Sequence, residues 1–165
     1  EIAASTRIGI IDTRVFGDKD IGIQEFVTAL EIIDKTLEPK RNELNKIQSR
    51  INDRVRDLYS CSMDKARSEL HKKELNELND NLTGLNREYE EMLRELMTER
   101  IDPIKLKIKR SISQFATENA YKAIVEVNEI CETSVKDLIC FDHTLDVTNK
   151  FIDYYNNQPP DKTSQ

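Results

Sequence analysis

The chain has 165 residues, 34% of them charged, a net charge of −6, only four Gly, four Pro and no Trp. This composition predicts one elongated helical domain rather than a compact enzyme. The acidic balance argues against binding to nucleic acid or to anionic membranes, because both need a concentrated cationic face. With 38% hydrophobic residues, a single copy cannot bury a wide core, which indicates an oligomer.

No apolar stretch approaches the roughly 20 residues that a membrane-spanning helix needs. The sequence starts at Glu1 without a signal-peptide h-region, so we expect any export signal to have been removed or never included. Cys61, Cys131 and Cys140 lack C-x-x-C spacing, and an odd count leaves at least one thiol unpaired within the monomer. A Cys131–Cys140 bridge can form if the segment is exported and folds as a hairpin. Buried or free thiols are the alternative.

The first predicted element is a short strand at residues 7–12, followed by turn residues around 17–22. From about Ile23 the apolar spacing becomes helical, in steps of three, four or seven. This first apolar repeat contains Leu30, Ile33, Leu37, Leu44, Ile47, Ile51, Val55 and Leu58. Lys40 and Arg41 interrupt it, and the nearby Pro39 predicts a break or kink near Glu38.

A second apolar repeat steps by three and four without an error, which is typical of a coiled coil. It contains Leu75, Leu78, Leu82, Leu85, Tyr89, Met92 and Leu96. Turn residues at 59–64 separate the two repeats, and matched positions have numbers that add to 129, as Ile47 and Leu82 do. The sequence therefore predicts an antiparallel helical hairpin, an arm that protrudes from a body, with Tyr89 opposite Lys40.

After Leu96 the apolar stripe changes phase and reappears at Ile101, Ile104, Ile108, Ile112 and Phe115. Pro103 lies where the phase changes, so we expect the helix to kink there. Pro39 and Pro103 are the two hinge candidates, and Pro103 is the stronger one. Two further strands are predicted at 121–127 and 137–141, then a last helix at 147–156 and a disordered tail at 158–165.

The predicted fold class is α+β and mainly α, with a small β-rich trimerisation body and a long antiparallel coiled-coil arm. The body comprises residues 1–25 and 104–157, and the arm comprises 26–103. The predicted arm seam consists of Leu37, Leu44, Ile47, Ile51, Leu58, Leu78, Leu82, Leu85, Tyr89, Met92 and Leu96. The predicted body strands contain Ile8, Ile10, Ile124, Val125 and Ile139.

This order of elements resembles the Skp/OmpH family of periplasmic outer-membrane-protein chaperones. The opening RIGIIDTRVF at 7–16 is similar to that family's first strand. The segments YKAIVEVNE at 121–129 and DLICFDHTLDVTNKFIDYYN at 137–156 are similar to its closing strands and final helix, whose start is Asp146-Val147-Thr148 here. The resemblance covers residues 7 to about 157. It rests on the placement of both end motifs on either side of so long a hairpin.

The resemblance implies a soluble periplasmic homotrimer whose three arms enclose unfolded outer-membrane proteins without ATP, nucleotide or metal. The best-studied members are strongly basic, whereas this chain is acidic. Residues 50–74 nevertheless contain seven Lys or Arg against five Asp or Glu, so the arm tip can be mildly cationic and steer acidic clients. A solvated coiled-coil flank is the alternative interpretation.

A holdase needs a protected volume and many weak contacts rather than catalysis. Tyr59 and Met63 are candidates for client contact, the alternative being that they cap the hairpin core. The cations in residues 105–110 can contact lipid or lipopolysaccharide phosphates, although Leu106 and Ile108 between them fit an ordinary amphipathic face better.

No catalytic, cofactor or metal set can be assembled from this sequence. His71 is interpreted as a solvated helix residue, and His143 as a capping or surface residue. The competing function is a trimeric structural coiled-coil scaffold of the cell envelope, which the same heptads would serve. An enzyme with an inserted hairpin is a third interpretation, but it lacks a site.

Overall fold

The structure is a computed structural model that describes residues 7–60, 65–127 and 142–159. It divides into two compact units, one drawn from residues 1–30 and 100–165 and the other from residues 31–99. Long helices dominate and a two-stranded sheet is present. This confirms the predicted mainly α, α+β fold class.

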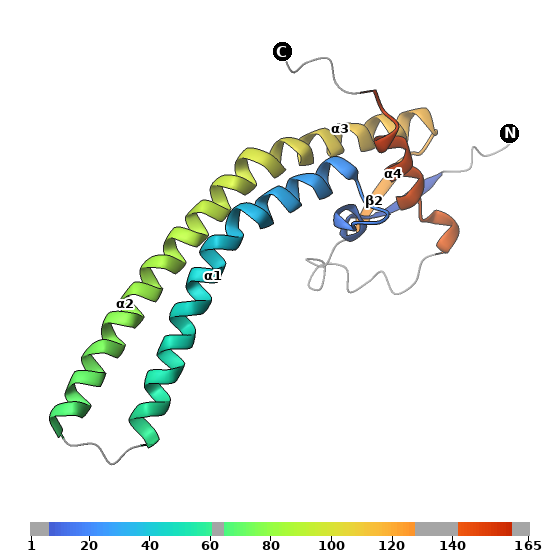
Figure 1. Ribbon diagram of the computed structural model, residues 1–165. Helices are drawn as coiled ribbons and strands as arrows, with labels where there is room; N and C mark the ends of the chain where they lie inside the picture. Colours follow the sequence, from blue (N-terminus) through green and yellow to red (C-terminus); the bar gives the residue numbers. More distant parts are fainter. Residues whose placement is uncertain (1–6, 61–64, 128–141, 160–165) are drawn as a thin grey trace, which may run out of the picture. The chain divides into compact units, whose positions relative to one another are not determined.

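The unit of residues 31–99 is a hairpin of two long helices. Helix α1 (Gln24–Ser60) and helix α2 (Lys65–Leu96) run side by side in opposite directions (Figure 1). Ile47, Ile51 and Leu85 are buried between them. The half-buried residues that pack against this cluster are Leu44, Leu75, Leu78 and Leu82. A continuous apolar stripe on each helix therefore builds the seam, as its three-four spacing predicts.

Pro39 lies inside α1 and does not interrupt it. Of the predicted break or kink near Glu38, the break is wrong, whereas a kink is compatible with a continuous helix. A proline removes one backbone donor and crowds the preceding turn, which disfavours a helix locally. The neighbouring Ile33 and Leu37 are buried, with 5% and 1% of their surfaces exposed. Burial of these two side chains offsets the lost hydrogen bond and keeps the helix continuous.

A π-helical turn, η2 (Met97–Ile101), joins α2 to helix α3 (Asp102–Glu118). A π turn accommodates one residue more than an α turn. The apolar step from Leu96 to Ile101 is five residues rather than four, so η2 accounts for the change of phase seen in the sequence. Pro103 falls in the first turn of α3, where a missing N–H is tolerated.

The other unit contains a parallel pair of strands, β1 (Ile8–Asp12) and β2 (Ala123–Val127). Ile10 of β1 is opposite Val125 of β2, and its carbonyl oxygen accepts a hydrogen bond of 2.9 Å from the Val147 backbone N–H. Two segments, each more than 100 residues along the chain from β1, therefore pair with it. The buried Ile10 and Ile11 form one side of the core of this unit.

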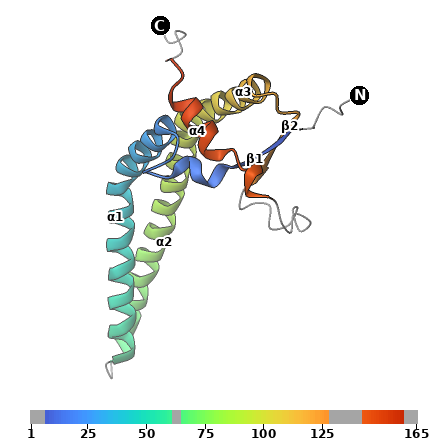
Figure 2. The ribbon, with the colours of Figure 1, turned by 90° about the vertical axis from the view of Figure 1, so that its right-hand side faces the viewer.

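Helix α4 (Thr148–Asn156) closes the core beside β1 (Figure 2). Its Phe151 is fully buried and contacts two other rings, Phe16 of the 3₁₀ helix η1 (Thr13–Gly17) and Phe115 of α3, both at 5.7 Å between centroids. Asp12 donates its backbone N–H to the buried Thr148 hydroxyl at 2.9 Å. The aromatic contacts hold α4 against η1 and α3. The hydrogen bond between Asp12 and Thr148 holds it against β1.

The end of α3 is a Schellman motif. The Tyr121 N–H donates to the Ala116 carbonyl at 2.9 Å and the Ala120 N–H donates to the Thr117 carbonyl at 3.2 Å. Ala120 has a φ of 56°, the left-handed conformation that this motif requires. The motif turns the chain from α3 towards β2. Tyr121, which precedes β2, stacks on Phe115.

Several predictions lie outside the described residues. They concern the strand at 137–141, the tail beyond residue 159, and the residues Cys61, Met63, Cys131, Ile139 and Cys140.

Candidate functional site

The seam of the hairpin is less buried towards the end where α1 stops and α2 begins. Of the predicted seam residues, Leu37, Ile47, Ile51 and Leu85 are buried. Leu44, Leu58, Leu78, Leu82, Tyr89 and Leu96 are half-buried. Met92 is 40% exposed. The buried positions of α1 therefore end at Ile51, and the apolar seam becomes thinner beyond it.

Lys40 introduces a polar layer into the seam. Its ammonium group donates a hydrogen bond to Glu88 on α2 and lies 3.8 Å from Glu43 on its own helix. The hydrogen bond to Glu88 raises the pKa of Lys40. The half-buried Tyr89 was predicted opposite this gap, yet the cation reaches the neighbouring carboxylate instead. Because a long side chain can follow the apolar surface and keep its charge near water, the polar gap is tolerated.

Arg41, the other polar residue of this gap, points along its own helix. Its guanidinium donates to Asp34 at 2.6 Å. Contact with Asp34, and to a smaller extent with Tyr89, raises the pKa of Arg41. Arg41 therefore pairs with Asp34 on α1 and also contacts Tyr89 of α2, whereas Lys40 forms an ion pair with Glu88 across the seam.

Arg54 forms a second polar layer in the seam. The apolar repeat predicted from the sequence contained its neighbour Val55 instead. Arg54 Nε lies 3.3 Å from Glu74 Oε2 on α2, and Arg54 Nη1 lies 3.8 Å from Asp57. Val55 is 38% exposed. The assignment of Val55 to the seam is wrong. The regular three-four spacing after Ile51 leads to position 54, and choosing the nearest apolar residue concealed that a cation occupies it.

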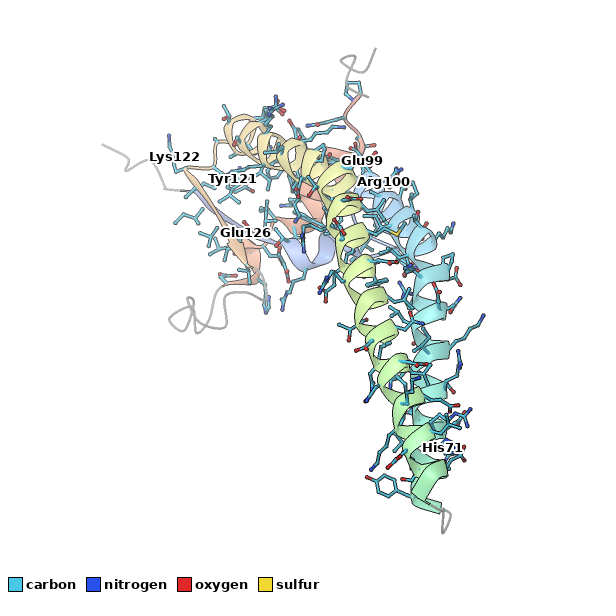
Figure 3. The ribbon with its side chains drawn as sticks, turned by 90° about the vertical axis from the view of Figure 1, so that its left-hand side faces the viewer. His71, Glu99, Arg100, Tyr121, Lys122 and Glu126 are labelled. Carbon is cyan, nitrogen blue, oxygen red and sulfur yellow. The ribbon has the colours of Figure 1, made fainter. Side chains whose placement is uncertain are left out.

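His71 is a seam residue and not a solvated one. Its side chain is 14% exposed and its Nδ1 lies 3.7 Å from Glu74 Oε2. Figure 3 shows it close to the start of α2. The solvated interpretation is wrong because it relied on the charged neighbours of His71. The constant-sum register, extended by one layer, already pairs His71 with Leu58.

Apolar side chains are exposed near the same end of the hairpin. Tyr59 is 89% exposed and Leu70 is 56% exposed. Tyr59, a predicted client contact, therefore presents its ring to solvent and does not cap the hairpin core. Exposed aromatic and aliphatic groups of this kind are suited to weak, unspecific contacts with apolar segments of another chain.

The cations of residues 105–110 divide between two faces of α3. Lys107 donates to Glu25 at 2.9 Å and lies 5.5 Å from the centre of the Tyr155 ring. Ile108 is buried, whereas Leu106 is 59% exposed. This alternation is the amphipathic face expected from the sequence. The other cations of this segment are exposed, namely Lys105, Lys109 and Arg110.

The small sheet leaves apolar groups uncovered. Ile8 is 39% exposed and Val125 is 41% exposed, although they belong to the predicted body strands. Ile10 of the same set is buried and Ile124 is half-buried. Figure 3 labels Lys122, which precedes β2, and Glu126, which lies within it. A two-stranded sheet of this size is marginal by itself, so these positions are candidates for contact with another copy.

The described residues contain no group of three or more His, Cys, Asp or Glu side chains that could hold a metal ion. His143 is exposed in the 3₁₀ helix η4 (His143–Leu145). Within the described part of the chain, no helix combines the length and the apolarity needed to cross a bilayer. The described residues thus form a two-helix seam, an end of the hairpin with exposed apolar side chains, and a partly uncovered sheet.

The sequence profile of the family described as outer membrane protein (OmpH-like) matches residues 22–155. The chain belongs to the OmpH-like family. The match covers the hairpin, β2 and most of α4, and it confirms the Skp/OmpH resemblance. This is a periplasmic family with a chaperone-type function towards outer-membrane proteins, rather than a family of enzymes. A search of curated proteins found no match.

Proposed function

We propose that this OmpH-like protein is a periplasmic, ATP-independent holdase that binds unfolded outer-membrane proteins as a homotrimer and prevents their aggregation. The observation that carries the proposal is the long two-helix hairpin with exposed apolar groups at one end, in a chain that belongs to this family. A holdase of this kind requires a long arm and many weak apolar contacts. The two-helix hairpin and its exposed Tyr59 and Leu70 support both requirements.

The uncovered apolar groups of the sheet support association with further copies. Ile8 and Val125 are exposed on β1 and β2, and an oligomer interface would remove them from water. Three copies would bring three hairpins to one client. Because several weak contacts on linked arms act at a high effective concentration, their combined affinity would exceed that of each contact.

The contacts themselves need no specific client sequence. Tyr59 and Leu70 offer an aromatic ring and an aliphatic side chain, which bind apolar segments without a fixed hydrogen-bonding pattern. Lipopolysaccharide or a membrane surface is a further proposed partner, through the exposed Lys105, Lys109 and Arg110 beside Leu106.

The test is an aggregation assay with the full chain. A urea-unfolded outer-membrane protein is diluted into buffer with and without the protein, and light scattering is followed. We expect scattering to be suppressed at about one trimer per client, without nucleotide. Scattering that is unchanged at a severalfold excess would contradict the holdase and would favour a structural scaffold of the envelope.

A further inference from the structure

The two polar layers of the hairpin have the same design. In each, a cation at a seam position lies between an acidic residue of its own helix and a glutamate of the other helix. The first layer is Lys40 with Glu43 and Glu88. The second layer is Arg54 with Asp57 and Glu74. Each member of the second layer is 14 positions along the chain from its counterpart, which is two heptads.

The second layer is the weaker of the two. Glu74 Oε2 is buried and, among the described residues, accepts no hydrogen bond, although Arg54 Nε is 3.3 Å away. His71 Nδ1 is buried without a hydrogen-bond partner in the same part of the structure. An unsatisfied buried polar atom destabilises the closed state. In the first layer, Lys40 is hydrogen-bonded to a Glu88 side chain that is 63% exposed, whereas the Glu74 side chain is 37% exposed.

Apolar support differs on the two sides of Arg54. Towards the middle of the hairpin, Ile47, Ile51 and Leu85 are buried. Towards the end of α1, Leu58 is half-buried and Tyr59 is exposed. Local opening has a low free energy where few apolar contacts are broken, and it stops at a well-packed block. The structure therefore contains a weak end section and a firm middle section.

We propose that the Arg54–Glu74 layer is a latch that controls opening of the end section, residues 52–59 of α1 and 68–76 of α2, independently of the middle section. Opening would expose Leu58 and Leu75 beside the already exposed Tyr59 and Leu70. This enlarges the apolar surface available to an extended apolar segment of an unfolded protein. The role in client binding rests on the proposed holdase function, whereas the latch itself does not.

The latch is tested by hydrogen–deuterium exchange of the full chain, without client, with Glu74→Gln as the variant. Glu77→Gln is the matched control, because Glu77 is exposed and is 3.9 Å from Lys73 of its own helix. We expect exchange in peptides within 52–59 and 68–76 to become about fivefold faster in Glu74→Gln, as loss of one ion pair implies. Peptides within 42–51 and 78–86 keep their rates. Rates equal to those of Glu77→Gln, or equal acceleration in both sections, would overturn the latch.

The double variant Arg54→Leu with Glu74→Leu gives the opposite change. It replaces both partners of the ion pair by apolar side chains beside Ile51 and Leu58, and such replacements of a whole pair are commonly stabilising. We expect slower exchange in the end section than in the natural protein. Exchange as fast as in Glu74→Gln would overturn the latch, because closure of the end section would then not depend on the ionic layer.

The role in client binding has its own readout. In the aggregation assay we expect the double variant Arg54→Leu with Glu74→Leu, with its closed end section, to protect less client per trimer than Glu74→Gln does. Equal protection by the two variants would remove the client role and leave the exchange result standing. Failure of the natural protein to protect any client would remove the proposed function, and the latch would still be decided by exchange.

Discussion

The carboxylate of Asp12 is held by its neighbour Arg14 at the end of β1. Asp12 Oδ1 accepts from the Arg14 backbone N–H at 3.0 Å, and Asp12 Oδ2 accepts from the Arg14 guanidinium at 2.6 Å. The hydrogen bonds from Arg14 lower the pKa of Asp12, against an opposing effect of burial. A lowered pKa in the folded state means that ionised Asp12 stabilises the fold above its ordinary pKa of about 4, and that this is lost as the pH falls through the lowered value.

Asp12→Asn keeps a capping side chain and removes the charge. We expect it to reduce the free energy of unfolding by about 0.5–1 kcal/mol near neutral pH, since Arg14 is half exposed and solvent weakens the pair. Urea unfolding measured from about pH 7 down to about pH 2.5 checks this. The difference between the two proteins should shrink below about pH 4. A difference that stays constant over this range would contradict the role of the charge.

Ala120→Gly tests the strained end of α3. Ala120 has a φ of 56°, where a Cβ atom is unfavourable by roughly 1 kcal/mol and Gly is not. Gly also loses more freedom on folding, which offsets part of the gain. We therefore expect the free energy of unfolding to rise by about 0.5 kcal/mol in urea unfolding. As a control, Ala116→Gly lies inside α3 and should destabilise by a similar or larger amount.

At the scale of elements, the apolar spacing predicted the hairpin because a seam buries one face of each helix, and Ile47, Ile51 and Leu85 are buried as that argument requires. The same argument overlooks polar residues in the seam, because it considers only apolar side chains. Arg54 and His71 occupy seam positions that an apolar pattern skips, and position alone identifies them. The constant-sum register was the one signal that could have found both.

The joint at η2 could be located from the sequence but not characterised. The phase change after Leu96 shows that a residue is inserted, whereas a π turn has no composition of its own. Parallel pairing of β1 with β2 was likewise not predictable, because a strand sequence does not specify a partner about 110 residues away. Aromatic contacts of Phe151 with Phe16 and Phe115 decide that arrangement.

Pro103 follows η2 and remains our preferred hinge. Pro103→Ala removes the ring that crowds the preceding turn, η2, and should stiffen the joint, so small-angle scattering should show a narrower distribution of molecular dimensions. The stiffened variant should protect a narrower range of client sizes. Pro39→Ala, inside the continuous α1, is the comparison and should leave the distribution unchanged. An unchanged distribution in Pro103→Ala would count against the hinge.

At the scale of the whole molecule, apolar side chains are exposed at two separate places. Ile8 and Val125 are exposed on the sheet, and Tyr59 and Leu70 are exposed on the hairpin. In the trimer that we propose, the first pair would lie between copies, since burial of apolar side chains stabilises an oligomer. The second pair would remain available to a client. The proposed trimeric holdase requires two such separate surfaces.

The central claim is that three chains together hold one unfolded client. The most direct measurement is the mass of the complex in solution, obtained by light scattering on a size-exclusion column after a urea-unfolded outer-membrane protein is diluted into the purified protein. We predict a free protein with three times the mass of one chain, and a soluble complex of that trimer with one client. A monomeric protein, or a client that elutes only as aggregate while the protein elutes alone, would contradict the account.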